Sequence, residues 1–193
     1  LAIAMTGIFD DSMVQPGISF VLAVRCVLDK CANVKEAVKS LSGMRASSCA
    51  NFLVADKSGD MAVAEVSPDK VMIRKPEHGD RFIVCTNHFV LSEMQQYGAE
   101  IWDSVPRYTA ISKGITKAGS KIDLALAQQI MSDHAGFVCS HRSDIRLGTL
   151  WSIVASLKTL EVYRAEGNPC KTRYREDSKL RRSTSAHSLE IET

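Results

Sequence analysis

Apolar positions in the first part of the chain predict one strand followed by two helices. Residues 1–6, LAIAMT, read as a strand that starts without a lead-in. In Ile18–Cys31 the apolar side chains recur at intervals of three and four residues, which is typical of one face of a helix. Asn33 and Glu36 have the spacing of a capping box, and the helix that they start is expected to end at Gly43.

The middle of the chain predicts a meander of short strands. Asn51–Ala55 and Met61–Val66 flank residues 56–60, a five-residue loop with a glycine that is typical of a β-hairpin. Val71–Arg74 and Arg81–Cys85 have the composition of two further short strands. We therefore expect four short strands in succession here.

Helices return in the second half and are followed by two strands. Ser104–Lys117 opens with Ser-Val-Pro, which is typical of a helix start with proline in its first turn. Ile122–Ser132 repeats apolar positions at helical spacing, and Thr149–Ala155 and Leu160–Ala165 are expected strands joined by a short turn. The order of strand, helices, strands, helices and strands predicts an α+β fold with helices segregated onto the sheet faces.

Composition and charge exclude several classes of protein. Of the 193 residues, 45% are hydrophobic and 24% are charged, near the average for a soluble globular domain. The formal net charge of +2 provides no strong attraction to nucleic acid or anionic lipid. The longest apolar run stops at Arg25, well short of the ~20 residues of a membrane span. We expect neither nucleic acid nor a membrane as a partner.

The domain is expected to end near residue 170. Residues 1–170 carry the predicted elements, whereas residues 171–193 form a charged C-terminal tail. The amino terminus lacks the positive region and small-residue cleavage site of a signal peptide. The six cysteines stand at positions 26, 31, 49, 85, 139 and 170 without a C-x-x-C pair, and predict reduced thiols in a cytoplasmic protein.

Three residues late in the chain are of metal-ligating types. His134, Cys139 and His141 follow one another closely, but the sequence shows no evident fourth ligand. We therefore expect an ordinary loop with no metal, and keep a zinc-dependent regulator as a third hypothesis. No P-loop, G-x-G-x-x-G or G-x-S-x-G motif is present, so no cofactor is expected.

Two polar residues are candidates for catalysis. Asn87 follows a predicted strand, where its amide could donate a hydrogen bond to a developing oxyanion; the alternative is a residue that only forms a turn. Arg107 stands in the first turn of a predicted helix, where the helix dipole disfavours a cation. A residue placed there is expected to have a carboxylate or a ligand as partner, unless it is simply a solvated surface arginine.

A series of stretches, taken in order, resembles a known family. These are residues 17–41, SSCANFLVADKSGDMAVAE (47–65), VCTNHF (84–89), SVPRY (104–108), HAGFVCSH (134–141), GTLWSIVASL (148–157) and GNPC (167–170). They resemble the acyl-coenzyme A:6-aminopenicillanate acyltransferase, or C45 peptidase-like, branch of the choloylglycine hydrolase group of N-terminal nucleophile hydrolases. The resemblance covers nearly all of residues 1–170.

The resemblance implies a fold, a reaction and roles for two residues. The fold is the four-layer αββα sandwich, and the reaction is hydrolysis of a linear amide or transfer of its acyl group. The family's nucleophile is an amino-terminal cysteine whose own α-amine, with a pKa near ~7.7–8, acts as the base. Asn87 matches the family's oxyanion-binding asparagine, and Arg107 matches an arginine of its catalytic pocket.

One departure from the family pattern shapes the expected function. The nucleophilic cysteine and its neighbouring aspartate would lie upstream of the strand at Leu1, and none of the six cysteines matches them. We therefore expect part of a longer enzyme, inactive alone, that acts on a small-molecule amide or acyl substrate with an upstream segment or partner chain. The alternative is a non-catalytic homologue that binds a partner through an exposed sheet edge; the sequence leaves a homo-oligomer open.

Overall fold

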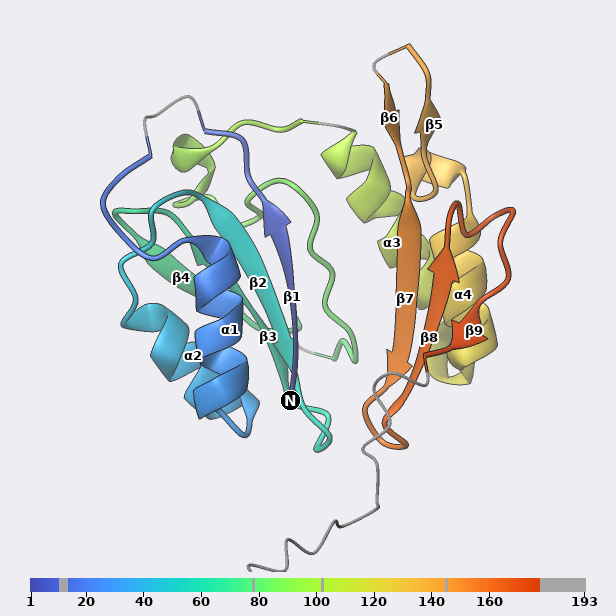
Figure 1. The fold of residues 1–193 in the computed structure, drawn as a ribbon, viewed down its shortest axis with the longest axis horizontal. Coiled ribbons are helices and arrows are strands. Elements are labelled where there is room, and N and C mark those ends of the chain that lie inside the picture. The colour runs from blue at the N-terminus through green and yellow to red at the C-terminus, as the bar shows by residue number, and fades with distance from the viewer. Residues whose placement is uncertain (11–13, 78, 102, 145, 178–193) are drawn as a thin grey trace, which may run out of the picture.

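A four-stranded and a three-stranded antiparallel sheet, each with helices on one face, form the fold of the described residues together with a small two-stranded sheet (Figure 1). The computed structural model describes residues 1–10, 14–77, 79–101, 103–144 and 146–177. The first half contains β1 (Ala2–Gly7), α1 (Phe20–Lys30), α2 (Val34–Ser42), β2 (Ala50–Ala55), β3 (Met61–Val66) and β4 (Val71–Arg74). The short 3₁₀ turn η1 (Gln95–Tyr97) ends this half. The second half contains α3 (Ser104–Ala118), α4 (Leu124–Ser132), β5 (His141–Arg142), β6 (Leu147–Gly148), β7 (Trp151–Ser156), β8 (Glu161–Glu166) and β9 (Arg175–Glu176), with the 3₁₀ turns η2 (Gly119–Lys121) and η3 (Ala135–Phe137).

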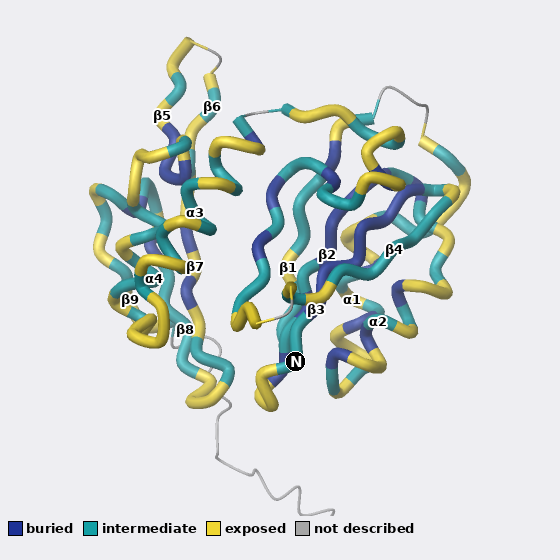
Figure 2. The backbone as a smooth tube through the Cα atoms, turned by 180° about the vertical axis from the view of Figure 1, so that it is seen from behind, coloured by how far each residue is buried: buried dark blue, intermediate teal, exposed yellow. Residues whose placement is uncertain are grey.

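The first sheet follows the predicted meander and carries the main apolar core. Its strands lie in the order β1-β2-β3-β4, and all are antiparallel. Helices α1 and α2 pack on one face, and the buried stretches of β2 and β3 are dark blue in Figure 2. The core side chains between helices and sheet are Ala23, Val27, Val34, Ala37, Leu41, Ala50, Phe52, Val54, Ala62, Ala64 and Val66.

The prediction of a strand at Arg81–Cys85 is wrong. These residues are irregular backbone, and a side chain of the first sheet binds one of their carbonyl groups. Arg74 Nη2 donates to the carbonyl of Val84 at 2.7 Å, and the segment continues beside β1 instead of joining the sheet. The carbonyl of Val84 therefore has a side-chain partner in place of a strand hydrogen bond.

The second sheet has the order β7-β8-β9, and α4 packs against β7. Side chains of β7 alternate: Ser152 and Val154 are buried, whereas Trp151 is 60% and Ile153 39% exposed. Strand β9 lies in the expected charged tail, of which residues 178–193 are outside the described part. The α+β class predicted from the sequence is confirmed, and no described helix is both long and apolar enough to span a membrane.

Candidate functional site

The candidate site is built where the segment around Asn87 crosses the end of β1. Thr6 Oγ1 donates to the carbonyl of Thr86 at 2.7 Å. Asn51 Nδ2 donates to the same carbonyl and to that of His88, both at 2.9 Å. Because Thr6 and Asn51 are cross-strand partners in β1 and β2, one point of the sheet fixes the backbone on both sides of Asn87.

A buried carboxylate holds the continuation of this segment. Glu65, on β3, is fully buried, and its two oxygens accept hydrogen bonds from the backbone N–H groups of Val90 and Leu91 at 3.1–3.2 Å. The guanidinium of Arg74 donates from Nε to Glu65 at 3.1 Å and from Nη2 to Val84. The charge on Glu65 is therefore paired with Arg74. The two residues attach both ends of the site segment, residues 84–91, to the first sheet.

The structure brings the two sequence-predicted site residues into contact. Arg107 Nη2 donates to Asn87 Oδ1 at 2.8 Å, and Asn87 Nδ2 donates to the carbonyl of Gly7 at 2.8 Å. Asn87 is therefore more than a turn-forming residue, since its side chain links the end of β1 to the first turn of α3. One of its two amide N–H groups is used by Gly7, and the amide can offer the other.

Arg107 has a different partner from the carboxylate or ligand expected from its position. Its direct partner is the amide oxygen of Asn87, while Asp103, the residue before α3, acts on it through its charge. Burial lowers the pKa of Arg107, and the charge of Asp103 opposes that shift. A guanidinium remains protonated at neutral pH, so Arg107 is a fixed positive charge behind Asn87.

His88 is a neighbour of this pair that sequence reasoning did not select. Its Nδ1 lies 2.7 Å from Ser104 Oγ and 3.1 Å from Thr86 Oγ1, and its ring meets Tyr108 edge-on with 5.6 Å between centroids. Burial lowers the pKa of His88, which favours the neutral imidazole. Its place beside Asn87 in the VCTNHF stretch was the available signal, and its contacts attach the segment to the start of α3.

Two cysteines near the first sheet, the buried Cys49 and the partly exposed Cys85, are poor nucleophiles. All six cysteines are free. Burial raises the pKa of the Cys85 thiol to about 11, and burial together with Asp10 raises that of Cys49 to about 12. Since the thiolate is the attacking form, neither group is activated at neutral pH.

A second cluster of reactive side chains lies in the other half of the molecule. His134, Cys139 and His141, singled out from the sequence, come together with Cys170. The four possible ligand atoms all lie within 4.8 Å of one another. Sequence reasoning missed Cys170 because it is remote along the chain and is brought in by the turn after β8.

The comparison with protein families agrees with this fold and with the motifs. The architecture is that of an α+β protein with a polar site at the end of an edge strand. The family model described as acyl-coenzyme A:6-aminopenicillanic acid acyl-transferase matches residues 1–171. The chain therefore belongs to this family, as its motifs predicted, and the family suggests acyl transfer or amide hydrolysis. No curated protein matches the chain.

Proposed function

We propose that the chain forms the oxyanion-binding side of an enzyme that hydrolyses a linear amide or transfers its acyl group to an acceptor. The attacking group is the family's amino-terminal cysteine, which is not among the six cysteines of this sequence. The observation that supports the proposal most directly is the chain of contacts from Arg107 through Asn87 to Gly7. It joins two residues that match the family motifs but stand on different elements.

In this proposal Asn87 stabilises the negative charge that develops on the substrate carbonyl. Its remaining amide N–H donates to the oxyanion, a contact typically worth ~3–4 kcal/mol of the barrier. The positive charge of Arg107 on Oδ1 draws electron density from the amide and strengthens the donor. The bond to Gly7 fixes the amide plane, so little reorganisation is needed during the reaction.

The covalent steps follow from the family's nucleophile. The α-amine takes the thiol proton, the sulfur attacks the carbonyl, and the tetrahedral intermediate collapses to a thioester as the leaving amine receives that proton. Water or an acceptor amine then gives a proton to the α-amine and attacks the thioester; the C–S bond breaks, the sulfur leaves and regains that proton as the thiol, and the carboxylic acid or the new amide is released. These steps require an amide or an activated acyl group, and we expect its carrier to be a small molecule.

The four-layer αββα sandwich belongs to the same proposal. Each sheet has helices on one face, and the face of β7 opposite α4 carries Trp151 and Ile153, both exposed. A sheet face that has no helix on it and carries exposed apolar side chains is the kind of surface that another sheet covers in a sandwich.

The test is the turnover of the whole gene product with and without Asn87. We expect Asn87→Ala to lower kcat for amide hydrolysis by about 10²–10³-fold, because an oxyanion donor is lost. The matched control is Asn33→Ala, which removes the side-chain cap of α2 and should cost about 1 kcal/mol of stability with unchanged kcat.

Two outcomes would contradict the proposal. Normal turnover by the Asn87→Ala enzyme would remove the role assigned to that residue. A folded gene product that binds acyl compounds or a protein partner but turns over neither amides nor acyl donors would favour the non-catalytic alternative. Residues 1–193 alone should show no turnover, and addition of the nucleophile segment should restore it.

A further inference from the structure

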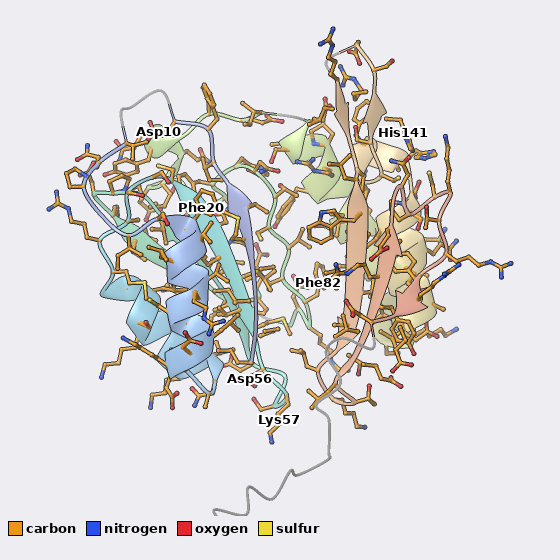
Figure 3. The ribbon with its side chains drawn as sticks, viewed as in Figure 1. Asp10, Phe20, Asp56, Lys57, Phe82 and His141 are labelled. Carbon is orange, nitrogen blue, oxygen red and sulfur yellow. The ribbon has the colours of Figure 1, made fainter. Side chains whose placement is uncertain are left out.

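Four side chains with metal-binding atoms meet at one end of the second half. His134 follows α4, Cys139 follows η3, His141 lies in β5, and Cys170 lies in the turn between β8 and β9. Cys139 Sγ lies 3.6 Å from His141 Nε2, which lies 3.1 Å from Cys170 Sγ. The rings of His134 and His141 meet edge-on at 5.2 Å between centroids. Figure 3 labels His141 at the start of β5.

These separations suit a tetrahedral metal ion. With Zn–S bonds of ~2.3 Å and Zn–N bonds of ~2.0–2.1 Å, neighbouring ligand atoms of a tetrahedral site are about 3.3–3.8 Å apart. The distances from His141 Nε2 to the two sulfur atoms, 3.1 and 3.6 Å, lie close to this range, and all four ligand atoms lie within 4.8 Å of one another. Two thiols and two imidazoles form the Cys₂His₂ set of a closed structural zinc site.

The backbone around the ligands is arranged to keep them together. The N–H of Cys139 donates to the carbonyl of Asp133 at 2.7 Å, which closes the loop that begins at His134. Gly136, inside this loop, has φ of +57°, and a Cβ there would collide with the carbonyl of Pro106 in α3. The loop is therefore packed against α3 in a form that requires glycine.

A second set of hydrogen bonds places Cys170. Ser132 Oγ, in the last turn of α4, donates to the carbonyl of Pro169 at 3.1 Å. The N–H groups of Lys171 and Thr172 both donate to the carbonyl of Asn168 at 2.9 Å, so Cys170 lies within a tight turn. The end of α4 and this turn therefore place His134 and Cys170 in the same cluster.

The described residues of the second half bury few apolar side chains that could hold this loop and turn together. Among the described residues, both clusters of buried apolar side chains lie before residue 98. In the second half the buried apolar residues are Val138, Cys139, Val154 and Ala165, while Leu150, Trp151 and Leu160 are largely exposed. Domains with little buried apolar surface are commonly held together by a metal or by disulfides.

We propose that His134, Cys139, His141 and Cys170 bind one structural Zn²⁺ ion. Binding releases the two thiol protons and joins the end of α4 to β5 and to the turn before β9. Arg142 follows the ligand His141 directly, and its Nη1 lies 2.8 Å from Asp103 Oδ2 at the start of α3. The metal would therefore brace the beginning of the helix that carries Arg107.

The test measures metal content and coordination in the purified protein. We expect about one zinc ion per chain by elemental analysis. Replacement by Co²⁺ should give the intense visible bands of a tetrahedral ion and the near-ultraviolet band of thiolate ligands. Removal of the metal with a chelator should lower the unfolding temperature.

Variants then assign the ligands. Cys170→Ser and His134→Asn should each lose most of the zinc and change the Co²⁺ spectrum. Cys26→Ser, at a free cysteine on α1 outside the cluster, should keep both. His134 is exposed, so its replacement leaves the core intact. The His134→Asn variant therefore still tests the site if a cysteine variant fails to fold.

Three results would overturn the proposal. The first is purified protein without zinc that gives no tetrahedral spectrum with Co²⁺. The second is equal metal content in Cys26→Ser, Cys170→Ser and His134→Asn, which would mark an adventitious ion only. The third is a Cys139–Cys170 disulfide found by mass spectrometry in protein prepared under reducing conditions.

Discussion

Glu65 shows how a single buried residue can position a site that it does not touch. Its carboxylate binds two backbone N–H groups beyond Asn87, and Arg74 binds the backbone before Asn87. Removal of either charge would leave the other buried without its partner. The site segment therefore depends on an ion pair in the first sheet.

We predict that Glu65→Gln lowers the free energy of unfolding by about 3–5 kcal/mol, because the guanidinium of Arg74 loses its buried counter-charge. The measurement is urea denaturation followed by circular dichroism. Asp60→Asn is the matched control: its ion pair with Lys75 is exposed and should contribute about 0–1 kcal/mol. Equal losses in the two variants would argue against the role of Glu65.

At the scale of residues, the sequence allowed Asn87 and Arg107 to be predicted, but not most of the residues that hold them in place. Asn87 and Arg107 were recognisable by type, by position and by family motif. Glu65 and Asn51 were not, because their importance comes from backbone groups that only the folded chain brings to them. Cys170 was missed for the same reason.

At the scale of elements, the start of α2 depends on a residue from a different part of the chain. The Asn33 side chain accepts from the N–H of Glu36, and Asp56, at the start of the β2–β3 loop in Figure 3, accepts from the N–H of Val34 at 2.9 Å. Asp56 also accepts from the backbone and the hydroxyl of Ser58. The hairpin loop and the helix therefore share one carboxylate.

This arrangement predicts a pH dependence of stability. The bonds from Ser58 and Val34 lower the pKa of Asp56 to about 2, below the ~3.9 of an unfolded aspartate. The stabilisation is therefore complete above about pH 4 and is lost as the pH falls toward 2. We expect Asp56→Asn to be less stable than the wild type at pH 6, with the difference shrinking between pH 4 and 2.

Denaturant titrations across this pH range measure the difference. Asp29→Asn, an exposed aspartate on α1, is the control and should leave the pH profile of stability unchanged. A difference between Asp56→Asn and wild type that stayed constant from pH 6 to 2 would contradict the assignment.

Periodicity predicted the longer elements well and the short ones poorly. The helices and the strands of four to six residues appear close to their predicted ranges, because each has enough residues to show a repeat. Strands β5, β6 and β9 have two residues each and show no repeat. Arg81–Cys85 had a strand's composition, but the carbonyl of Val84 is bound by the Arg74 side chain and not by a neighbouring strand.

At the scale of the whole molecule, the apolar core is unevenly distributed. The described clusters of buried apolar residues belong to the first half, and Figure 2 shows the longest buried stretches in β2 and β3. Local stability generally follows such burial. Local unfolding is therefore expected to occur more readily in the second sheet than in the first.

We predict that amide hydrogen exchange is slowest in β2 and β3 and clearly faster in β7 and β8. The reason is that β3 is buried along nearly its whole length, whereas β7 is exposed at alternate residues. Mass spectrometry of peptides from the two sheets provides the measurement. Equal protection of the two sheets would show that the exposed face of β7 is covered in solution.

The pairing of β1 with β2 has a consequence for how correct folding of the chain can be recognised. Thr6 and Gly7 contact the segment around Asn87 only when Thr6 stands opposite Asn51. A slip of two residues would keep every side chain on its original face and satisfy the ladder, yet would carry these contacts away by about 7 Å. A mispaired chain would keep its strand ladder and lose these contacts, so spectroscopic evidence of folding alone would not distinguish it from the correctly paired chain.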